Sequence, residues 1–146
     1  MRRAIYIGYD PREADAYAVA RGSLLRHLSE PISVHGLVLA QLQCDGLYTR
    51  PIERIAGRLV DVKSRRPDYS GAMSTEFALS RFLVPHLANT GWALFMDFDI
   101  LVRRDIAQLF ALADPSKAVM CVQHDYAPSH REKMDGQIQT PYARKN

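Results

Sequence analysis

Residues 92–102 (WALFMDFDILV) form an apolar run interrupted by two carboxylates, and this feature limits the fold most strongly. Asp97 and Asp99 are two positions apart, so on a strand both side chains would point the same way. Converging carboxylates repel each other unless a cation lies between them. Mn²⁺ or Mg²⁺ prefers oxygen ligands and leaves coordination sites for substrate phosphates. The pattern predicts a buried strand ending in a metal site. The alternative is a strand followed by a turn, with both carboxylates in water.

Size and composition fit a single domain with its own core, because 47% of the 146 residues are hydrophobic. The formal net charge of +3 suits an anionic ligand, while the lack of a basic block argues against nucleic-acid binding. No segment is long and apolar enough to predict a transmembrane helix. Cys44 and Cys121 lie far apart without metal or redox spacing, so we expect reduced thiols in or near the core. The expected location is cytoplasmic, at most peripheral to the inner face of a membrane.

The first part of the chain predicts a strand, a helix and a second strand. Residues 4–9 and 32–39 have the apolar character of buried strands. Between them, Asp10 is placed to cap a helix that has Pro11 at its first position and reaches about Leu28. This order predicts a parallel unit. Residues at helical spacing predict the apolar face of the helix: Ala16, Val19, Ala20, Ser23, Leu24 and His27.

Further elements continue the alternation. We expect a strand over 58–62, a helix over 74–84, a helix over 104–112 and a strand over 118–123. Ser74 would cap the helix that follows it, Leu79, Phe82 and Leu83 would form its apolar side, and Pro85 would bend or end it. The chain is thus predicted to be α/β, with a Rossmann-like, mostly parallel sheet flanked by helices. Residues 1–146 are expected to form one domain.

Polar side chains follow three of the predicted strands. In a parallel sheet, ligands bind beyond the carboxyl ends of the strands, so these residues would face one crevice. Tyr9 would stack on a base and Asp10 would accept from a base N–H, although Asp10 is equally well explained as a helix cap. The full set is Tyr9, Asp10, Asp97, Asp99, His124 and Asp125.

Arg81 is a candidate for binding phosphate. It lies among apolar residues on a predicted helix, and a guanidinium in such surroundings needs a partner. A phosphate or ribose is a good partner, while the alternatives are a nearby carboxylate or solvent. The chain contains no Gly-rich phosphate loop.

Several motifs together resemble a known family. They are a first strand ending in Asp10, Ser23-Leu24 in the next helix, S-x-E-F-x-x-x-R over 74–81, and F-M-D-F-D-I-L-V over 95–102 followed by Arg104-Asp105-Ile106 and Leu109-Phe110. Residues 4–125 thereby resemble the GT-A glycosyltransferases, in particular the family 8-like retaining enzymes. The resemblance implies a GT-A fold and hexosyl transfer from a nucleotide-sugar donor, usually a UDP-sugar, to a glycan, lipid or protein acceptor.

The resemblance also implies roles for individual residues. Asp97 and Asp99 would bind Mn²⁺ (or Mg²⁺), and Arg81 would contact the phosphate or sugar region of the donor. The remaining donor-binding residues would be Tyr9, Asp10, Phe98 and His124, with Asp125 as an alternative to His124. No catalytic residue is assigned. Members of the family are usually longer, and their second half supplies a third metal ligand and most of the acceptor site. We therefore expect the chain to be an N-terminal donor-binding portion.

Two other functions remain open. In a haloacid dehalogenase-like phosphatase, the first aspartate of an apolar D-x-D attacks phosphorus and the second acts as acid and base. Such an enzyme also needs a downstream Lys and carboxylates, for which the chain offers Asp105, Asp114, Lys117 and Asp125 without an evident pattern. The third possibility is a non-catalytic nucleotide-binding remnant.

Overall fold

The computed structural model describes residues 2–64 and 72–122 of the chain. The chain divides into two compact units, which are described separately below. Unit 1 comprises Met1–Arg50 and Glu76–Asp114, and unit 2 comprises Pro51–Thr75 and Pro115–Asn146. Whether residues 1–146 act as one domain stays a prediction.

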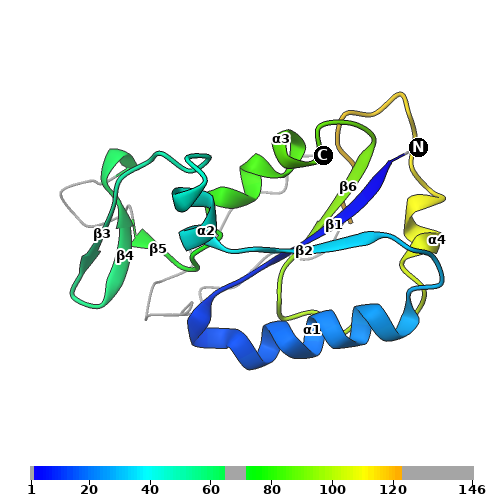
Figure 1. Cartoon of the computed structure of the whole chain (residues 1–146), viewed down its shortest axis with the longest axis horizontal. Coiled ribbons are helices and arrows are strands. Elements are labelled where there is room, and N and C mark those ends of the chain that lie inside the picture. Colours follow the sequence, from blue (N-terminus) through cyan, green and yellow to red (C-terminus); the bar gives the residue numbers. More distant parts are fainter. Residues whose placement is uncertain (1, 65–71, 123–146) are drawn as a thin grey trace. The chain divides into compact units, whose positions relative to one another are not determined.

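Unit 1 is built around a parallel three-stranded sheet, as the sequence predicted. Its strands are β1 (Arg3–Gly8), β2 (Ser33–Leu37) and β6 (Trp92–Met96), and β1 lies in the middle (Figure 1). Ile5 and Ile7 of β1 are fully buried and form the centre of the core. The predicted α/β class with a parallel sheet flanked by helices is confirmed for this unit.

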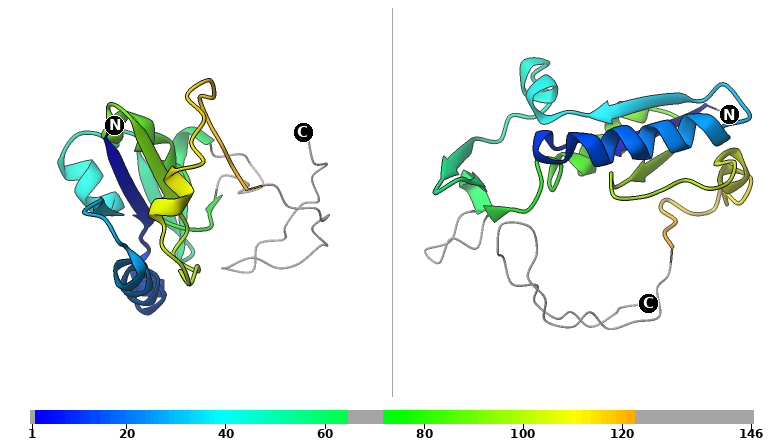
Figure 2. Two further views of the ribbon diagram at one scale, coloured as in Figure 1. Left: turned by 90° about the vertical axis from the view of Figure 1, so that its right-hand side faces the viewer. Right: turned by 90° about the horizontal axis from the view of Figure 1, so that it is seen from below.

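The connection from β1 to β2 is helical and begins where the sequence predicted. The Asp10 side chain accepts from the backbone N–H of Arg12 and caps a 3-10 turn, η1 (Pro11–Glu13), with proline in its first turn. Helix α1 (Ala14–His27) follows and lies along one side of the sheet (Figure 2). Of its predicted apolar face, Ala20, Ser23 and Leu24 are buried, whereas Val19 is exposed.

The predicted helix over 74–84 is wrong. A 3-10 helix, η3, begins only at Ser80 (Ser80–Leu83), and α3 (Val84–Ala88) follows it. Pro85 lies in the first turn of α3, where its missing N–H costs nothing, so it helps to start a helix rather than end one. Phe82, expected in the core, is 75% exposed, and Phe77 is buried instead.

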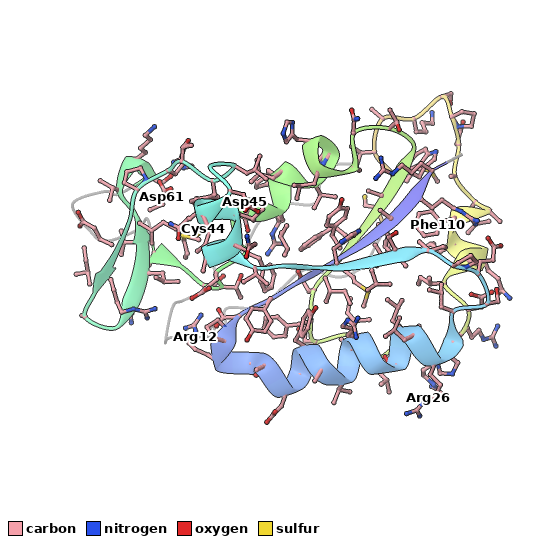
Figure 3. The ribbon with its side chains drawn as sticks, in the orientation of Figure 1. Arg12, Arg26, Cys44, Asp45, Asp61 and Phe110 are labelled. Carbon is pink, nitrogen blue, oxygen red and sulfur yellow. The ribbon has the colours of Figure 1, made fainter. Side chains whose placement is uncertain are left out.

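Two short helices and the two cysteines also differ from the sequence predictions. Helix α2 (Leu39–Cys44) was not predicted, and α4 (Ala107–Phe110) is shorter than the expected helix over 104–112. Cys44, labelled in Figure 3, is exposed, and so is Cys121. The prediction that both thiols lie in or near the core is therefore wrong.

Unit 2 contains an antiparallel sheet in the order β3–β4–β5. Strands β3 (Ile52–Ile55) and β4 (Arg58–Asp61) form a hairpin, in which Ala56 and Gly57 both have positive φ. This geometry fits a two-residue hairpin turn. Strand β5 (Ala72–Met73) pairs with β4, and η2 (Val62–Ser64) follows β4. The strand predicted over 58–62 is confirmed, but its partners are antiparallel.

The strand expected over 118–123 is absent from its described part, residues 118–122. Among the helices that the structure describes, none has the length and apolar character needed to cross a membrane.

Candidate functional site

The ends of β1 and β6 meet at one edge of the sheet in unit 1. These strands are parallel neighbours, and Ile7 pairs with Met96, the last residue of β6. Tyr9 and Asp10 therefore leave the sheet beside Asp97. The structure brings together the residues that the sequence placed at the ends of the first and fourth predicted strands.

Asp97 and Asp99 lie just beyond the strand. Because β6 ends at Met96, the strand alternation that we expected for the two carboxylates does not apply, and residues 98 and 99 form a turn. Phe98 points into the core, where it is 7% exposed and meets the ring of Phe77 edge-on at 5.3 Å. Asp99 is exposed. Packing of the middle residue thus holds the turn that carries both carboxylates.

Asp97 is only partly satisfied within the described structure. Its Oδ1 atom is buried and accepts no hydrogen bond from any described residue. The Nη1 atom of Arg81 lies 3.6 Å from this oxygen, close enough for an ion pair but beyond hydrogen-bond distance. Burial raises the pKa of Asp97 above its ordinary value; the positive charge of Arg81 opposes this, and the negative charge of Asp99 adds to it.

Aromatic rings fix the position of Arg81. Its guanidinium carbon lies 5.2 Å from the ring centre of Phe77 and 5.2 Å from that of Phe95, within the range of cation–π attraction. Its Nε also donates to the carbonyl oxygen of Phe77 at 3.4 Å. The alternative partner foreseen for Arg81, a nearby carboxylate, is Asp97. The rings position the cation beside that carboxylate at the edge of the sheet.

Asp97 and Asp99 are the side chains that could hold a divalent cation at this edge. The buried Oδ1 of Asp97, which accepts no hydrogen bond from a described residue, offers an oxygen ligand, and the charge of Asp99 is close enough to affect the pKa of Asp97. Within residues 2–64 and 72–122, no group of three or more His, Cys, Asp or Glu side chains could hold a metal. A cation here would complete its coordination with water and with the phosphates of a ligand.

Asp10 is occupied by structural contacts. The side chain is fully buried, and its two oxygens accept from the Nε and Nη2 atoms of Arg12 at 2.9 and 2.7 Å and from the N–H of Glu76 at 3.1 Å. Burial works to raise the pKa of Asp10, but these hydrogen bonds and the charge of Arg12 outweigh it and hold the pKa below its ordinary value. Arg12 lies at the start of the helical segment (Figure 3). These contacts favour the helix-cap interpretation over contact with a base.

Tyr9 is half-buried and packs edge-on against Tyr17 of α1, with ring centres 5.1 Å apart. It lies at the predicted edge of the sheet. His124 and Asp125 lie outside the described residues, so their predicted roles stay predictions.

The segment after the two aspartates is tied to α1 and to the loop after it. The buried Ser23 hydroxyl accepts from the N–H of Val102 at 3.0 Å and donates to the carbonyl oxygen of Ala20. Further on, the carboxylate of Asp105 accepts from the backbone N–H of Ser29 at 3.2 Å and from the N–H of Ala107 at 3.0 Å. The hydrogen bond from the Ser29 hydroxyl, together with those from the two backbone N–H groups, holds the pKa of Asp105 below its ordinary value.

Sequence reasoning assigned no role in the site to Phe77, Phe95 or Ser23. The signal for Phe77 was its position four residues before Arg81 in the motif over 74–81, from which we predicted no contact between the two side chains. Phe95 is part of the same apolar run as the carboxylates. For Ser23, nothing in the sequence indicated that its hydroxyl would bind a backbone amide 79 positions away.

Comparison with known proteins gives one close relative. Protein CDI of Arabidopsis thaliana is 45% identical to the chain over 143 residues, which is 97% of the chain and 49% of the relative. The chain thus spans about half the length of that relative. No family model and no solved structure matches the chain.

Proposed function

We propose that the edge formed by the ends of β1 and β6 binds a nucleotide-diphosphate sugar, with UDP-sugar as the preferred class, through a divalent metal at Asp97 and Asp99. The chain would be a GT-A glycosyltransferase of the family 8-like group, or its donor-binding half, that transfers a hexosyl group to an acceptor. The observation that carries the proposal is the buried Oδ1 of Asp97, which accepts no hydrogen bond from the described residues and lies 3.6 Å from a guanidinium nitrogen.

This edge suits a diphosphate for electrostatic reasons. The exposed part of the Arg81 guanidinium can donate to a phosphate oxygen while its faces remain packed against Phe77 and Phe95. Asp97 and Asp99 repel an anion unless a cation neutralises them, so metal and diphosphate fit the edge together. When bound, Mn²⁺ or Mg²⁺ would stabilise the negative charge that develops on the leaving diphosphate.

Isothermal titration of the full chain with UDP tests the proposal. We expect binding in the presence of Mn²⁺ and at least about tenfold weaker binding in EDTA, since the carboxylates then face the phosphates without a metal. Asp97→Asn and Asp99→Asn should each remove most of the effect of Mn²⁺. Asp15→Asn in the first turn of α1 is the matched control and should leave it unchanged. Equal UDP binding with and without Mn²⁺ would contradict the proposal.

Product analysis separates the proposed reaction from the phosphatase alternative. A glycosyltransferase, incubated with a labelled UDP-sugar and an acceptor, releases UDP and transfers the label. A phosphatase releases inorganic phosphate from a phosphate monoester. Phosphate release that depends on Asp97 as nucleophile, without Mn²⁺-dependent UDP binding, would favour the phosphatase.

A further inference from the structure

The contact between Arg81 and Asp97 has the geometry of an ion pair in which a metal could replace the guanidinium. The two groups lie 3.6 Å apart, and Oδ1 of Asp97 is buried yet accepts no hydrogen bond from a described residue. The positive charge of Arg81 attracts this oxygen, but Arg81 donates no hydrogen bond to the lone pairs of the oxygen. A divalent cation needs the same oxygen, so it would compete with the guanidinium for the charge of Asp97.

Arg81 is held near Asp97 by contacts that do not involve Asp97. The rings of Phe77 and Phe95 flank its guanidinium, and the carbonyl oxygen of Phe77 accepts from its Nε. The guanidinium therefore stays near Asp97 when a metal approaches, and two positive groups then lie close together. At such distances like charges repel by amounts that affect binding, even at a partly exposed site.

A diphosphate would remove this repulsion. Its oxygens can bind the guanidinium and the metal together, so the positive charge of Arg81 attracts the ligand rather than opposing the metal. We infer that Arg81 is an internal counter-ion of Asp97 that weakens the binding of metal alone and makes metal and nucleotide diphosphate bind cooperatively. This inference rests on the proposed function and adds regulation of metal loading to the same site.

The inference predicts opposite effects of one substitution. Arg81→Met removes the charge but keeps an unbranched apolar side chain over the two rings. We expect Mn²⁺ alone to bind about three- to tenfold more tightly to this variant, because the repulsion is gone. UDP should bind more weakly to its Mn²⁺ complex, because the phosphate partner is lost. By linkage, UDP tightens Mn²⁺ binding by the same factor by which Mn²⁺ tightens UDP binding. This factor should fall in the variant.

The affinity for Mn²⁺ is measured by titrating the full chain with Mn²⁺, once with UDP and once without it. Electron paramagnetic resonance follows the free Mn²⁺. Arg21→Met, at an exposed position of α1, controls for the loss of one positive charge. Arg81→Lys keeps the charge and should keep the weak binding of metal alone. Arg81→Gln is a second neutral variant if thermal unfolding shows that Arg81→Met is not folded.

The outcomes separate the inference from the proposed function. The inference is overturned if neutral variants at Arg81 bind Mn²⁺ alone no more tightly than Arg21→Met does, while the unmodified chain still binds UDP with Mn²⁺. If the unmodified chain binds neither Mn²⁺ alone nor UDP with Mn²⁺, the proposed function fails, and the inference fails with it. Tighter binding of metal alone together with weaker binding of UDP supports both.

Discussion

At the scale of single residues, two aspartates at one edge of the sheet have opposite surroundings. Asp10 is fully buried and bound by Arg12 and by the N–H of Glu76. Asp97 has a buried oxygen without a hydrogen bond from the described residues. The pKa of the first is lowered and that of the second is raised. The hydrogen bonds to ionised Asp10 therefore stabilise the fold, whereas burial disfavours the ionised form of Asp97.

Asp10→Asn should lower the free energy of unfolding at pH 7 by about 2–3 kcal/mol, because it weakens a helix cap and removes the charge from a buried carboxylate that is hydrogen-bonded to Arg12. Since the folded pKa of Asp10 lies below the ordinary value of 3.8, its contribution is present above that pH and is lost as the pH falls through the folded pKa. Urea unfolding from pH 7 down to pH 3 checks this. A difference between the variant and the unmodified chain that grows below pH 3.8 would contradict the account.

Asp97→Asn, measured without metal, should have the opposite sign. Burial disfavours the ionised form of Asp97 in the folded chain, so removing the charge should raise the free energy of unfolding at pH 7. The gain should be no more than about 0.5 kcal/mol, since the side chain is 45% exposed and solvent screens it. Urea unfolding in EDTA measures it, and a loss above 1 kcal/mol would show that Asp97 has a structural role.

At the scale of elements, the packing of β1 against the segment before β6 sets the geometry of the site. A Cβ atom at Gly8 would lie 2.6 Å from the ring of Phe77, closer than side-chain atoms approach. Phe77 is 2% exposed and is in contact with both Phe98 and Arg81. The missing side chain at Gly8 therefore makes room for the ring that supports the turn of the two carboxylates and the guanidinium beside it.

Gly8→Ala should lower the free energy of unfolding by about 1–3 kcal/mol and should also weaken UDP binding in Mn²⁺, because Phe77 must shift. Gly22→Ala is the matched control: a Cβ there meets nothing within 4 Å, and alanine favours the helix. It should stabilise the chain by about 0.5–1 kcal/mol without changing UDP binding. Differential scanning calorimetry and titration of both variants check this. Equal effects of the two substitutions would contradict the packing argument.

Elements with strong local signals were predictable from the sequence. Asp10 and Pro11 mark the start of the helical segment, and the apolar runs around Ile5 and Leu94 mark two strands of one parallel sheet. That sheet places Tyr9, Asp10 and Asp97 at one edge, as expected. The hairpin of unit 2 was also predictable, because Ala56-Gly57 separates two strand-like runs, but only one of its two strands was predicted.

The segment over 74–84 could not be predicted, because tertiary contacts override its helix spacing. The N–H of Glu76 is used by Asp10, and Phe77 fills the space beside Gly8, so the chain becomes helical only at Ser80. The same contacts explain why the role of Asp10 was left open. The local sequence is compatible with Asp10 as a helix cap and with Asp10 as a ligand contact. Only the hydrogen bond from the N–H of Glu76, which is distant in sequence, shows that the carboxylate has a structural partner.

At the scale of the whole molecule, the chain corresponds to part of a longer relative. The chain spans about half of a relative that is 45% identical to it. At the edge of its sheet, unit 1 places Nη1 of Arg81 3.6 Å from Oδ1 of Asp97, with Asp99 two residues further along the chain. The location of the metal is therefore the first property of the proposed site to measure.

Paramagnetic broadening by Mn²⁺ locates the metal directly. In amide spectra of the full chain with excess UDP, sub-stoichiometric Mn²⁺ should first broaden the signals of Gly8 and Asp99, at the carboxyl ends of β1 and β6. The signals of Ala4 and Ala93, paired with each other near the other end of these strands, should keep their intensity longer, since each residue of a strand adds about 3.3 Å. Mg²⁺ serves as the diamagnetic reference. Broadening that is uniform, or strongest at Ala4 and Ala93, would contradict the account.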